Sequence, residues 1–327
     1  MARSTSMNGS WIAFPGWRAV AVLLSAWGIF GASYATSASF PVFDAMVYKN
    51  KPDPRALGMT PIRPLERFWA PGEPNDQVDA IGTRREAAKM ADYQGAVFID
   101  IEHWPVYDVP QGVAEQSIAK LARVASIVRG ALPRCRIGFY DIMPQSIYWP
   151  IVNRDEKQLR LWHESNQRTE RLASGVNFIC PSLYTFYADE KGWELCARTA
   201  LREARRYGKP VYPFLWPEYH VSNARLRDTY LPAHAWRREL EICRELADGI
   251  VIWGGWQREW DENAPWWTET KIFLRTANRR DTSEPRVDAG APGAGSLGRL
   301  ARSAGIFPCA CLRQGYDSGA GEGDLPL

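Results

Sequence analysis

Residues 95–105 of this chain read GAVFIDIEHWP, and this stretch decides the fold class. Its hydrophobic part is short, rich in β-branched and aromatic residues, and bounded by glycine and proline, which predicts a buried strand. Because side chains alternate along a strand, Phe98, Asp100 and Glu102 share one face, and the opposite face is wholly apolar. Two carboxylates therefore point the same way at the carboxyl end of the strand.

The pair formed by Asp100 and Glu102 predicts acid chemistry. A rise of about 3.3 Å per residue puts their β-carbons roughly 6 to 7 Å apart, so the charge on one carboxylate raises the pKa of the other. One group can then stay protonated near neutral pH beside an ionised neighbour, which is the equipment for cleaving a glycosidic bond. The alternatives are an ion pair with a nearby arginine and a calcium or magnesium site, although calcium gathers about six or more oxygens and only two carboxylates are local.

The composition limits the classes of protein and of partner. A chain of 327 residues, 46% of them hydrophobic, is long enough for one α/β barrel of about 200 to 250 residues. The formal net charge is only +3, and Lys and Arg are scattered among Asp and Glu. Neither a nucleic acid nor a membrane surface is therefore a favoured partner. The oligomeric state is left open.

The cysteines and histidines do not indicate a metal centre. The four histidines are isolated from one another in the sequence, and the cysteines lack the spacing of paired metal ligands, so we expect no metal and no cofactor. Four cysteines fall in apolar strand or helix patterns and are expected to be free buried thiols: Cys135, Cys180, Cys196 and Cys243.

Both ends of the chain differ from its middle. A basic flank precedes the short apolar stretch 19–31, and small residues follow it, which predicts a signal peptide over residues 1–38 and a secreted or periplasmic protein. An uncleaved anchor or a buried amino-terminal helix is the alternative. Residues 279–327 are rich in glycine and predict a disordered tail. The expected barrel domain is therefore 39–278.

The middle of the chain alternates strand-like and helix-like segments. Strands are expected at 42–47, 67–69, 95–102, 137–140, 178–183, 211–215 and 249–253. Amphipathic helices are expected at 113–132, 191–207 and 235–247. This alternation predicts an α/β fold with a parallel sheet, most economically closed as a (β/α) TIM-type barrel of seven to eight strands. A doubly wound open sheet is the alternative.

Polar and aromatic residues collect after these strands. In a barrel the carboxyl ends of all strands meet on one face, where active sites of this fold are built. Aromatic rings there can stack on sugar rings while their hydroxyl and indole groups bond sugar oxygens, although each ring could instead cap the core. The strand-end residues are Tyr140 and Asp141, Pro181-Ser182-Leu183-Tyr184, Trp216 with Glu218 and Tyr219, and Trp253-Gly254-Gly255-Trp256.

Five segments, in chain order, carry a family resemblance. They are residues 97–105, Gly138-Phe139-Tyr140 with Pro144 and Tyr148, Pro181-Ser182-Leu183-Tyr184, Pro210-Val211-Tyr212-Pro213-Phe214, and Ile250-Val251-Ile252-Trp253-Gly254. The first is similar to the Asp-Trp-Glu-x-Trp-Arg-Pro region of the hyaluronidases, glycoside hydrolase family 56, and the others resemble further motifs of that family. The resemblance spans about residues 40 to 275.

This resemblance implies a distorted barrel of seven strands and a substrate-assisted retaining mechanism, which needs no protein nucleophile. Glu102 would be the general acid and then the general base. Asp100 would hold the N-acetyl group of the substrate as its carbonyl oxygen attacks the anomeric carbon. Tyr184 would bond the acetamido group, with Tyr148 and Trp253 completing its pocket.

One departure from the family pattern concerns the substrate. The family has an arginine between the tryptophan and the proline, whereas Trp104 is followed directly by Pro105. Arginine is the natural partner of a uronic acid carboxylate. The absence of this arginine leaves open whether the substrate is polyanionic, although the glycosidase chemistry is still expected. We expect an exported endo-glycosidase acting on hyaluronan, chondroitin or another glycan that contains N-acetylhexosamine. The alternatives are a secreted carbohydrate-binding barrel without catalysis and a chitinase-like or lysozyme-like glycosidase.

Overall fold

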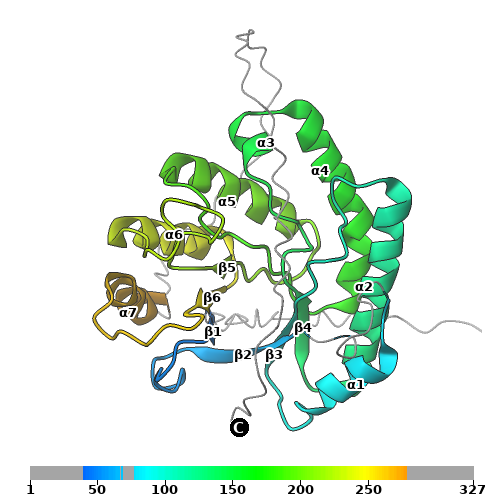
Figure 1. Ribbon diagram of the computed structural model, residues 1–327, viewed down its shortest axis with the longest axis horizontal. Coiled ribbons are helices and arrows are strands. Elements are labelled where there is room, and N and C mark those ends of the chain that lie inside the picture. Colours follow the sequence, from blue (N-terminus) through cyan, green and yellow to red (C-terminus); the bar gives the residue numbers. More distant parts are fainter. Residues whose placement is uncertain (1–39, 67, 69–76, 278–327) are drawn as a thin grey trace, which may run out of the picture. The chain divides into compact units, whose positions relative to one another are not determined.

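The computed structural model describes residues 40–66, 68 and 77–277, and these form a parallel sheet surrounded by helices (Figure 1). The strands are β1 (Val42–Met46), β2 (Thr60–Leu65), β3 (Ala96–Ile99), β4 (Arg136–Phe139), β5 (Phe214–Leu215) and β6 (Ile250–Gly254). The helices are α1 (Ala80–Ala88), α2 (Gln111–Ala131), α3 (Trp149–Val152), α4 (Glu156–Thr169), the 3-10 helix η1 (Glu170–Gly175), α5 (Glu190–Arg205), α6 (Ala233–Leu246) and α7 (Pro265–Ala277). The expected signal peptide and tail lie outside the described residues.

The sheet closes on itself through one irregular segment. Its six strands run in the order β4-β3-β2-β1-β6-β5. Residues 179–182 join the two edges by isolated parallel bridges, which pair Tyr140 with Cys180, Ile179 with Val211, and Ser182 with Phe214. Seven strand positions therefore follow one another around a ring, which confirms the distorted (β/α) TIM-type barrel.

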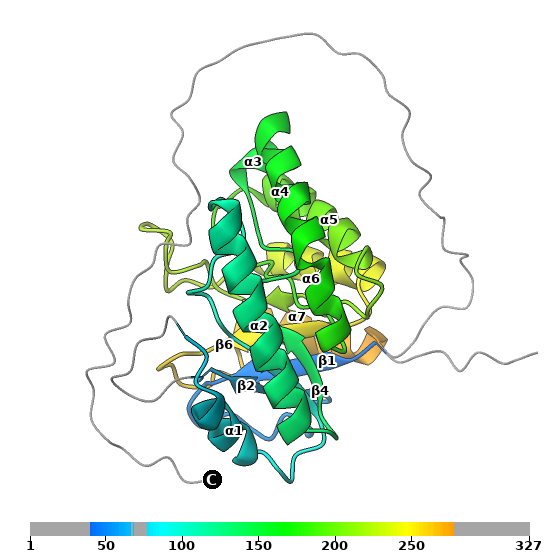
Figure 2. The same cartoon turned by 90° about the vertical axis from the view of Figure 1, so that its right-hand side faces the viewer.

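Alternation of side chains divides the core into two layers, as the sequence of β3 predicts. Val97 and Ile99 face outward into the large cluster between the strands and the helices. Phe98 faces inward and packs with the other residues that fill the barrel. Helices α1 and α2, α5 and α6, and α6 and α7 lie side by side around the outside (Figures 1 and 2). The inner layer comprises Phe43, Ala45, Ile62, Ala96, Phe98, Tyr140, Phe178, Cys180, Tyr212, Phe214 and Val251.

The second strand does not lie where the sequence indicated. It comprises Thr60–Leu65, whereas the expected segment was 67–69, of which residues 67 and 69 lie outside the described residues. The strand was not predicted because it contains Pro61 and Pro64, and proline has no N–H to donate to a strand ladder. The Leu65 carbonyl accepts the Asp100 N–H at 3.1 Å on the β3 side, so by alternation the nitrogen of Pro64 faces the β1 side. The ladder with β1 has already ended there, and no hydrogen bond is lost.

The segment expected as a strand at 178–183 forms only the isolated bridges, because Pro181 supplies no N–H to a continuous ladder. The other expected strands overlap β1, β3, β4, β5 and β6, and the expected helices overlap α2, α5 and α6. The four cysteines within the described residues are free, as predicted, with Cys135 partly exposed and the others buried. Within the same residues, no helix combines the length and the apolar character that crossing a membrane requires.

Three of the helices begin at an aspartate that accepts backbone hydrogen bonds. Asp79 caps α1, Asp155 caps α4 and Asp189 caps α5. Such a cap satisfies a backbone N–H that would otherwise have no partner, and it stabilises a helix by about 1 kcal/mol. Helices α1 and α4 were not predicted from the sequence, and the aspartates Asp79 and Asp155 are the signal that locates their first turns.

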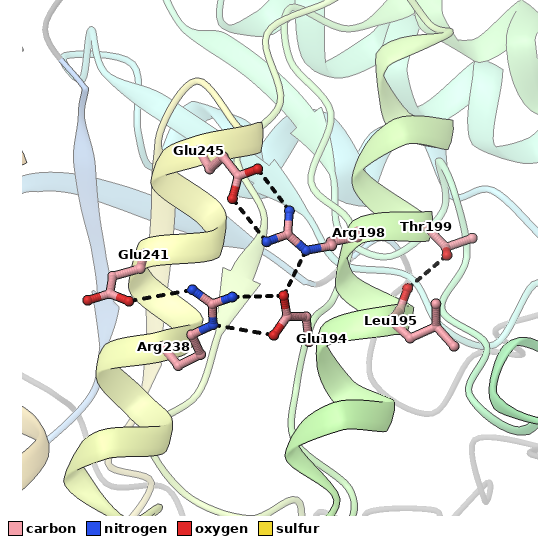
Figure 3. Close-up of polar contacts among 7 residues, drawn as sticks. All are labelled: Glu194, Leu195, Arg198, Thr199, Arg238, Glu241 and Glu245. Atoms are coloured by element: carbon pink, nitrogen blue, oxygen red, sulfur yellow. Dashed lines mark hydrogen bonds and ion pairs between the residues drawn. The ribbon is translucent and has the colours of Figure 1, made fainter. Parts of the chain in front are cut away.

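Helices α5 and α6 are held together by a network of ion pairs (Figure 3). Arg198 on α5 binds Glu194 on its own helix at 2.9 Å and Glu245 on α6 at 2.9 and 3.0 Å. Arg238 on α6 reaches back to Glu194 at 2.8 Å and lies 3.7 Å from Glu241. Single exposed pairs contribute about 0–1 kcal/mol, and networks contribute more. The network fixes α5 against α6 on the outside of the barrel.

Candidate active site

Asp100 and Glu102 follow β3 at the barrel mouth, as the sequence predicted. Asp100 is partly buried, and burial raises the pKa of its carboxyl to about 8, with further increases from the charges of Glu102, Glu66 and Asp141. The side chain of Glu102 is exposed, but the surrounding walls desolvate its carboxyl and raise its pKa as well. Burial is thus a larger cause than the mutual repulsion expected from the sequence. The site therefore holds a proton at neutral pH.

A third carboxylate, Asp141, follows the neighbouring strand β4. Its Oδ1 accepts hydrogen bonds from the backbone N–H of Ser146 at 3.0 Å, the Ser146 hydroxyl at 2.7 Å and the backbone N–H of Ser182 at 3.2 Å. Burial raises the pKa of Asp141 to about 7, although these hydrogen bonds lower it. Asp141 was expected at a strand end from the sequence, with no predicted role. We call Asp100, Glu102 and Asp141 the acid cluster.

Aromatic side chains stand beside the acid cluster. The Tyr140 hydroxyl donates to Ser182 Oγ at 3.1 Å. The Tyr184 ring lies 5.9 Å from the Tyr140 ring and 5.7 Å from the Trp253 ring, centroid to centroid. Burial raises the pKa of both tyrosines well above the ordinary value, and the charge of Asp100 contributes at Tyr184. Both hydroxyls therefore stay protonated, and the Tyr184 hydroxyl can donate a hydrogen bond to a ligand.

Trp216 supports this aromatic wall from behind. Its ring is buried, 4.7 Å from Trp253 and 5.4 Å from Tyr184. Its indole nitrogen is buried and has no hydrogen-bond partner among the described residues. Gly254 has a φ of 142°, and a Cβ at this position would lie 2.9 Å from Trp216 Cδ1. Only glycine therefore lets the chain leave β6 so close to Trp216.

A cleft of about 430 Å³ opens over these residues. Of the residues predicted from the sequence, Glu102, Tyr140, Tyr148 and Tyr184 line it. Asp100, Trp216 and Trp253 are not lining residues, and they contact or electrostatically influence Tyr184. The Tyr148 hydroxyl donates to Asp189 Oδ2 at 2.9 Å, so its proton is already engaged. The sequence did not predict the lining residues Asp141, Ser182, Phe186, His220 and Arg227 as site residues.

The segment 220–227, after β5, forms another part of the cleft wall. His220 Nδ1 accepts the backbone N–H of Ser222 at 3.2 Å, so its proton is assigned to Nε2. Burial lowers the pKa of His220 to about 4, which keeps the ring neutral at neutral pH. Arg227 is exposed and forms no ion pair with another described residue. The cleft thus combines carboxyl groups, tyrosine hydroxyls, a neutral imidazole and a guanidinium.

The arrangement suits a polar ligand with apolar ring faces. The carboxyls can transfer protons, the Tyr184 hydroxyl can donate a hydrogen bond, and the rings can stack on sugar faces. Within the described residues, no group of three or more His, Cys, Asp or Glu side chains has the arrangement of a metal site.

Comparisons with known proteins identify the fold. No family model matches the sequence, and no curated protein matches it. Among solved structures, bee venom hyaluronidase has a TM-score of 0.51 and 15% identity, over 73% of this chain and 97% of that chain. The same enzyme in complex with a hyaluronic acid tetramer has a TM-score of 0.51 and 15% identity, over 73% of this chain and 96% of that chain. A structure of fungal β-1,4-galactanases has a TM-score of 0.43 and 13% identity, over 72% of this chain and 87% of that chain. The hyaluronidase likeness shows the shared barrel fold.

Proposed function

We propose that this protein is a glycoside hydrolase that cleaves within a glycan containing N-acetylhexosamine, with Glu102 as general acid and base. The observation that carries the proposal is the position of Glu102 in the cleft, beside Tyr140 and Tyr184 and close to Asp100. The fold alone does not establish an activity, because this barrel hosts many chemistries. Carboxyls with raised pKa values in a cleft are a physical reason to infer acid–base catalysis.

In the first step, the Glu102 carboxyl would donate its proton to the glycosidic oxygen as the bond from this oxygen to the anomeric carbon breaks. The carbonyl oxygen of the substrate's own N-acetyl group would form the new bond to the anomeric carbon, giving a cyclic oxazolinium. Asp100 would accept the acetamido N–H and stabilise the positive charge. This order of events supplies the nucleophile from the substrate.

In the second step, the Glu102 carboxylate would take a proton from water as the water oxygen attacks the anomeric carbon. The bond from the carbonyl oxygen to the anomeric carbon breaks, and the acetamido group is restored. Two inversions give net retention of configuration. Glu102 ends protonated and ready for the next cycle, so one residue acts as acid and then as base.

The proton must reside on Glu102 when substrate is bound, whereas in the free cleft Asp100 has a pKa of about 8. Substrate binding shifts this balance in the required direction. A hydrogen bond from the acetamido N–H favours the charged form of Asp100, and a glycan that covers Glu102 desolvates its carboxyl further. The proton can therefore pass from one carboxyl to the other within the same cluster.

We propose that the substrate is acidic, as hyaluronan and chondroitin are. The five sequence motifs and the fold of bee venom hyaluronidase support this choice. The arginine of the family motif is absent after Trp104. Arg227 supplies a cation from a different part of the chain, because it lines the cleft and has no described ion-pair partner. Its guanidinium fits the carboxylate of a uronic acid unit.

The decisive experiment compares hyaluronan, chondroitin and chitin oligomers as substrates of the purified protein. We expect new reducing ends from hyaluronan or chondroitin. Release from chitin oligomers alone would favour the chitinase-like alternative. Binding without release, at every pH tested, would favour a carbohydrate-binding barrel and overturn the enzymatic proposal.

The mechanism has its own test. A thiazoline analogue of the cyclised acetamido intermediate should inhibit, and mechanism-based fluorosugars should leave no adduct in the intact-mass spectrum. A glycosyl ester on Asp100 would overturn substrate assistance and leave the glycosidase proposal standing.

We further propose that the protein is exported, on the strength of the basic flank and apolar stretch within residues 1–38. Amino-terminal sequencing of the protein recovered outside the cytoplasm should begin near Ser39. Retention of the intact terminus inside the cell would contradict export.

A further inference from the structure

Beyond the residues that line the cleft, two aromatic rings form a partly exposed pair. Trp149 opens α3 and leaves 39% of its surface exposed. Its indole N–H donates to the Tyr187 hydroxyl at 3.1 Å, and the two ring centroids are 4.8 Å apart. Tyr148 packs against both, with centroids 5.1 Å from Trp149 and 4.8 Å from Tyr187. The pair is therefore fixed in place while part of its surface remains open to solvent.

This pair continues the wall of the cleft. Tyr148 and Phe186 line the cleft, and Trp149 and Tyr187 directly follow them in the chain. A row of rings also leads outward from the acid cluster, each contacting the next. The steps are Tyr184 to His220 at 6.3 Å, His220 to Phe186 at 4.4 Å, Phe186 to Tyr187 at 6.4 Å and Tyr187 to Trp149 at 4.8 Å.

A second exposed tryptophan lacks these features. Trp256 leaves 60% of its surface exposed in the segment after β6 and has no ring contact with another described residue. It is the ordinary case of an isolated apolar residue at the surface. Trp149 differs because a hydrogen bond and two neighbouring rings fix its orientation.

We propose that Trp149 and Tyr187 form an outer sugar-binding subsite, occupied by a pyranose ring of the glycan chain whose bond Glu102 cleaves. The proposal rests on the proposed function. Indole and phenol rings stack on the apolar faces of sugars, and the phenol oxygen can bond a sugar hydroxyl. Held side chains lose little conformational entropy on binding, so such a platform is suited to recognition.

The surroundings select the kind of sugar. Asp189 accepts the Tyr148 hydroxyl at 2.9 Å, and the Tyr148 ring packs against Tyr187, so a carboxyl group is bonded to a ring of this cluster. A carboxyl group there repels a uronic acid carboxylate. The favoured occupant is therefore a neutral N-acetylhexosamine unit, and the acidic unit of an alternating polymer falls elsewhere along the cleft.

The subsite predicts that affinity depends on chain length. Binding of a ladder of oligosaccharides to the Glu102→Gln protein, measured by calorimetry, should show a gain once the chain is long enough to reach Trp149. Adding Trp149→Ala should reduce the ratio of long-chain to short-chain affinity by roughly 3- to 10-fold, the contribution of one aromatic contact. Trp149→Phe should restore part of the ratio, and Trp256→Ala should leave it unchanged.

The outcomes separate this proposal from the function on which it rests. An unchanged ratio in the Trp149→Ala protein, with binding intact, would overturn the subsite alone. Equal loss for short and long chains would also overturn it, because that result indicates damage to the cleft itself. Failure of the wild-type protein to bind or cleave any glycan would overturn the proposed function and the subsite together.

Discussion

A single carboxylate after β5 and the acid cluster after β3 and β4 differ in their partners. After β5, Glu218 is buried, with Oε2 bonded to Arg258 Nη1 at 2.6 Å and Oε1 accepting the Tyr48 hydroxyl at 3.1 Å. After β3 and β4, the acid cluster has carboxyls and hydroxyls for neighbours, and no described Lys or Arg forms an ion pair with it. A buried carboxylate paired with a cation is structural, whereas desolvated carboxyls without one retain a proton.

This difference shows where chemistry is expected. Both groups sit at strand ends, so position in the fold does not separate them. The cation does, because Arg258 compensates the charge of Glu218, and no such partner lowers the pKa values of Asp100 and Glu102. Substitutions on either side can therefore break or sharpen the contrast.

The largest expected effect is kinetic and falls on the acid cluster. Glu102→Gln should lower turnover on a confirmed glycan by roughly 10² to 10⁴, the contribution of one general acid or base, with little change in melting temperature. Glu164→Gln, on the exposed face of α4, is the matched control and should keep full activity. Near-full activity of Glu102→Gln would show that another group donates the proton.

The next effect is on stability and falls on the paired group. Arg258→Met leaves Glu218 buried beside Tyr48 without its cation, and we expect a loss of about 2 to 4 kcal/mol in the free energy of unfolding. This range is below that of a fully buried pair because the Arg258 side chain is 34% exposed. Urea denaturation measures it. An unchanged midpoint of denaturation would mean that Glu218 does not depend on its cation, so that the contrast with the acid cluster fails.

A further prediction concerns the pH profile. Since Asp100 has a pKa of about 8, the acid cluster should lose its proton as the pH rises through about 8, and kcat/KM should fall there. In Asp100→Asn the carboxyl with a pKa of about 8 is gone, so the fall in residual activity should move away from pH 8. In Arg258→Met, the fall in kcat/KM near pH 8 should be unchanged. If kcat/KM of Asp100→Asn falls at the same pH as that of the wild type, Asp100 is not the group whose titration limits activity.

The smallest effect is the stability of the Asp100→Asn protein. The native pKa of Asp100, about 8, exceeds the ordinary value of 3.8. The native state therefore binds more protons than the unfolded state between about pH 4 and pH 8, and wild-type stability falls as the pH rises through this window. Asp100→Asn should be more stable than wild type by about 0.5 to 2 kcal/mol at pH 8, with the gain disappearing near pH 4. Thermal melts at both values test it.

The acid pair could be predicted from the sequence because its geometry is local. Side chains alternate along β3, so Phe98 faces the inside of the barrel and Asp100, two residues later, faces the same way. This prediction needs the sequence of one strand only. The role of Glu218 could not be predicted, because its cation lies 40 residues away and is brought close by the fold. His220 and Arg227 were missed for a related reason, since loop residues have no periodicity that indicates which cavity they face.

The joint at residues 179–182 gives the barrel one side that is held less firmly than the rest. Ladders of four residue pairs connect β2 to β3 and β3 to β4, whereas single bridges connect this segment to its neighbours. Amide hydrogens there are expected to exchange with solvent sooner than those of β3, because local opening begins where few backbone hydrogen bonds must break. Glu102, the proposed proton donor, follows the firmly paired strand β3, whereas Tyr184 follows the segment that is expected to open first.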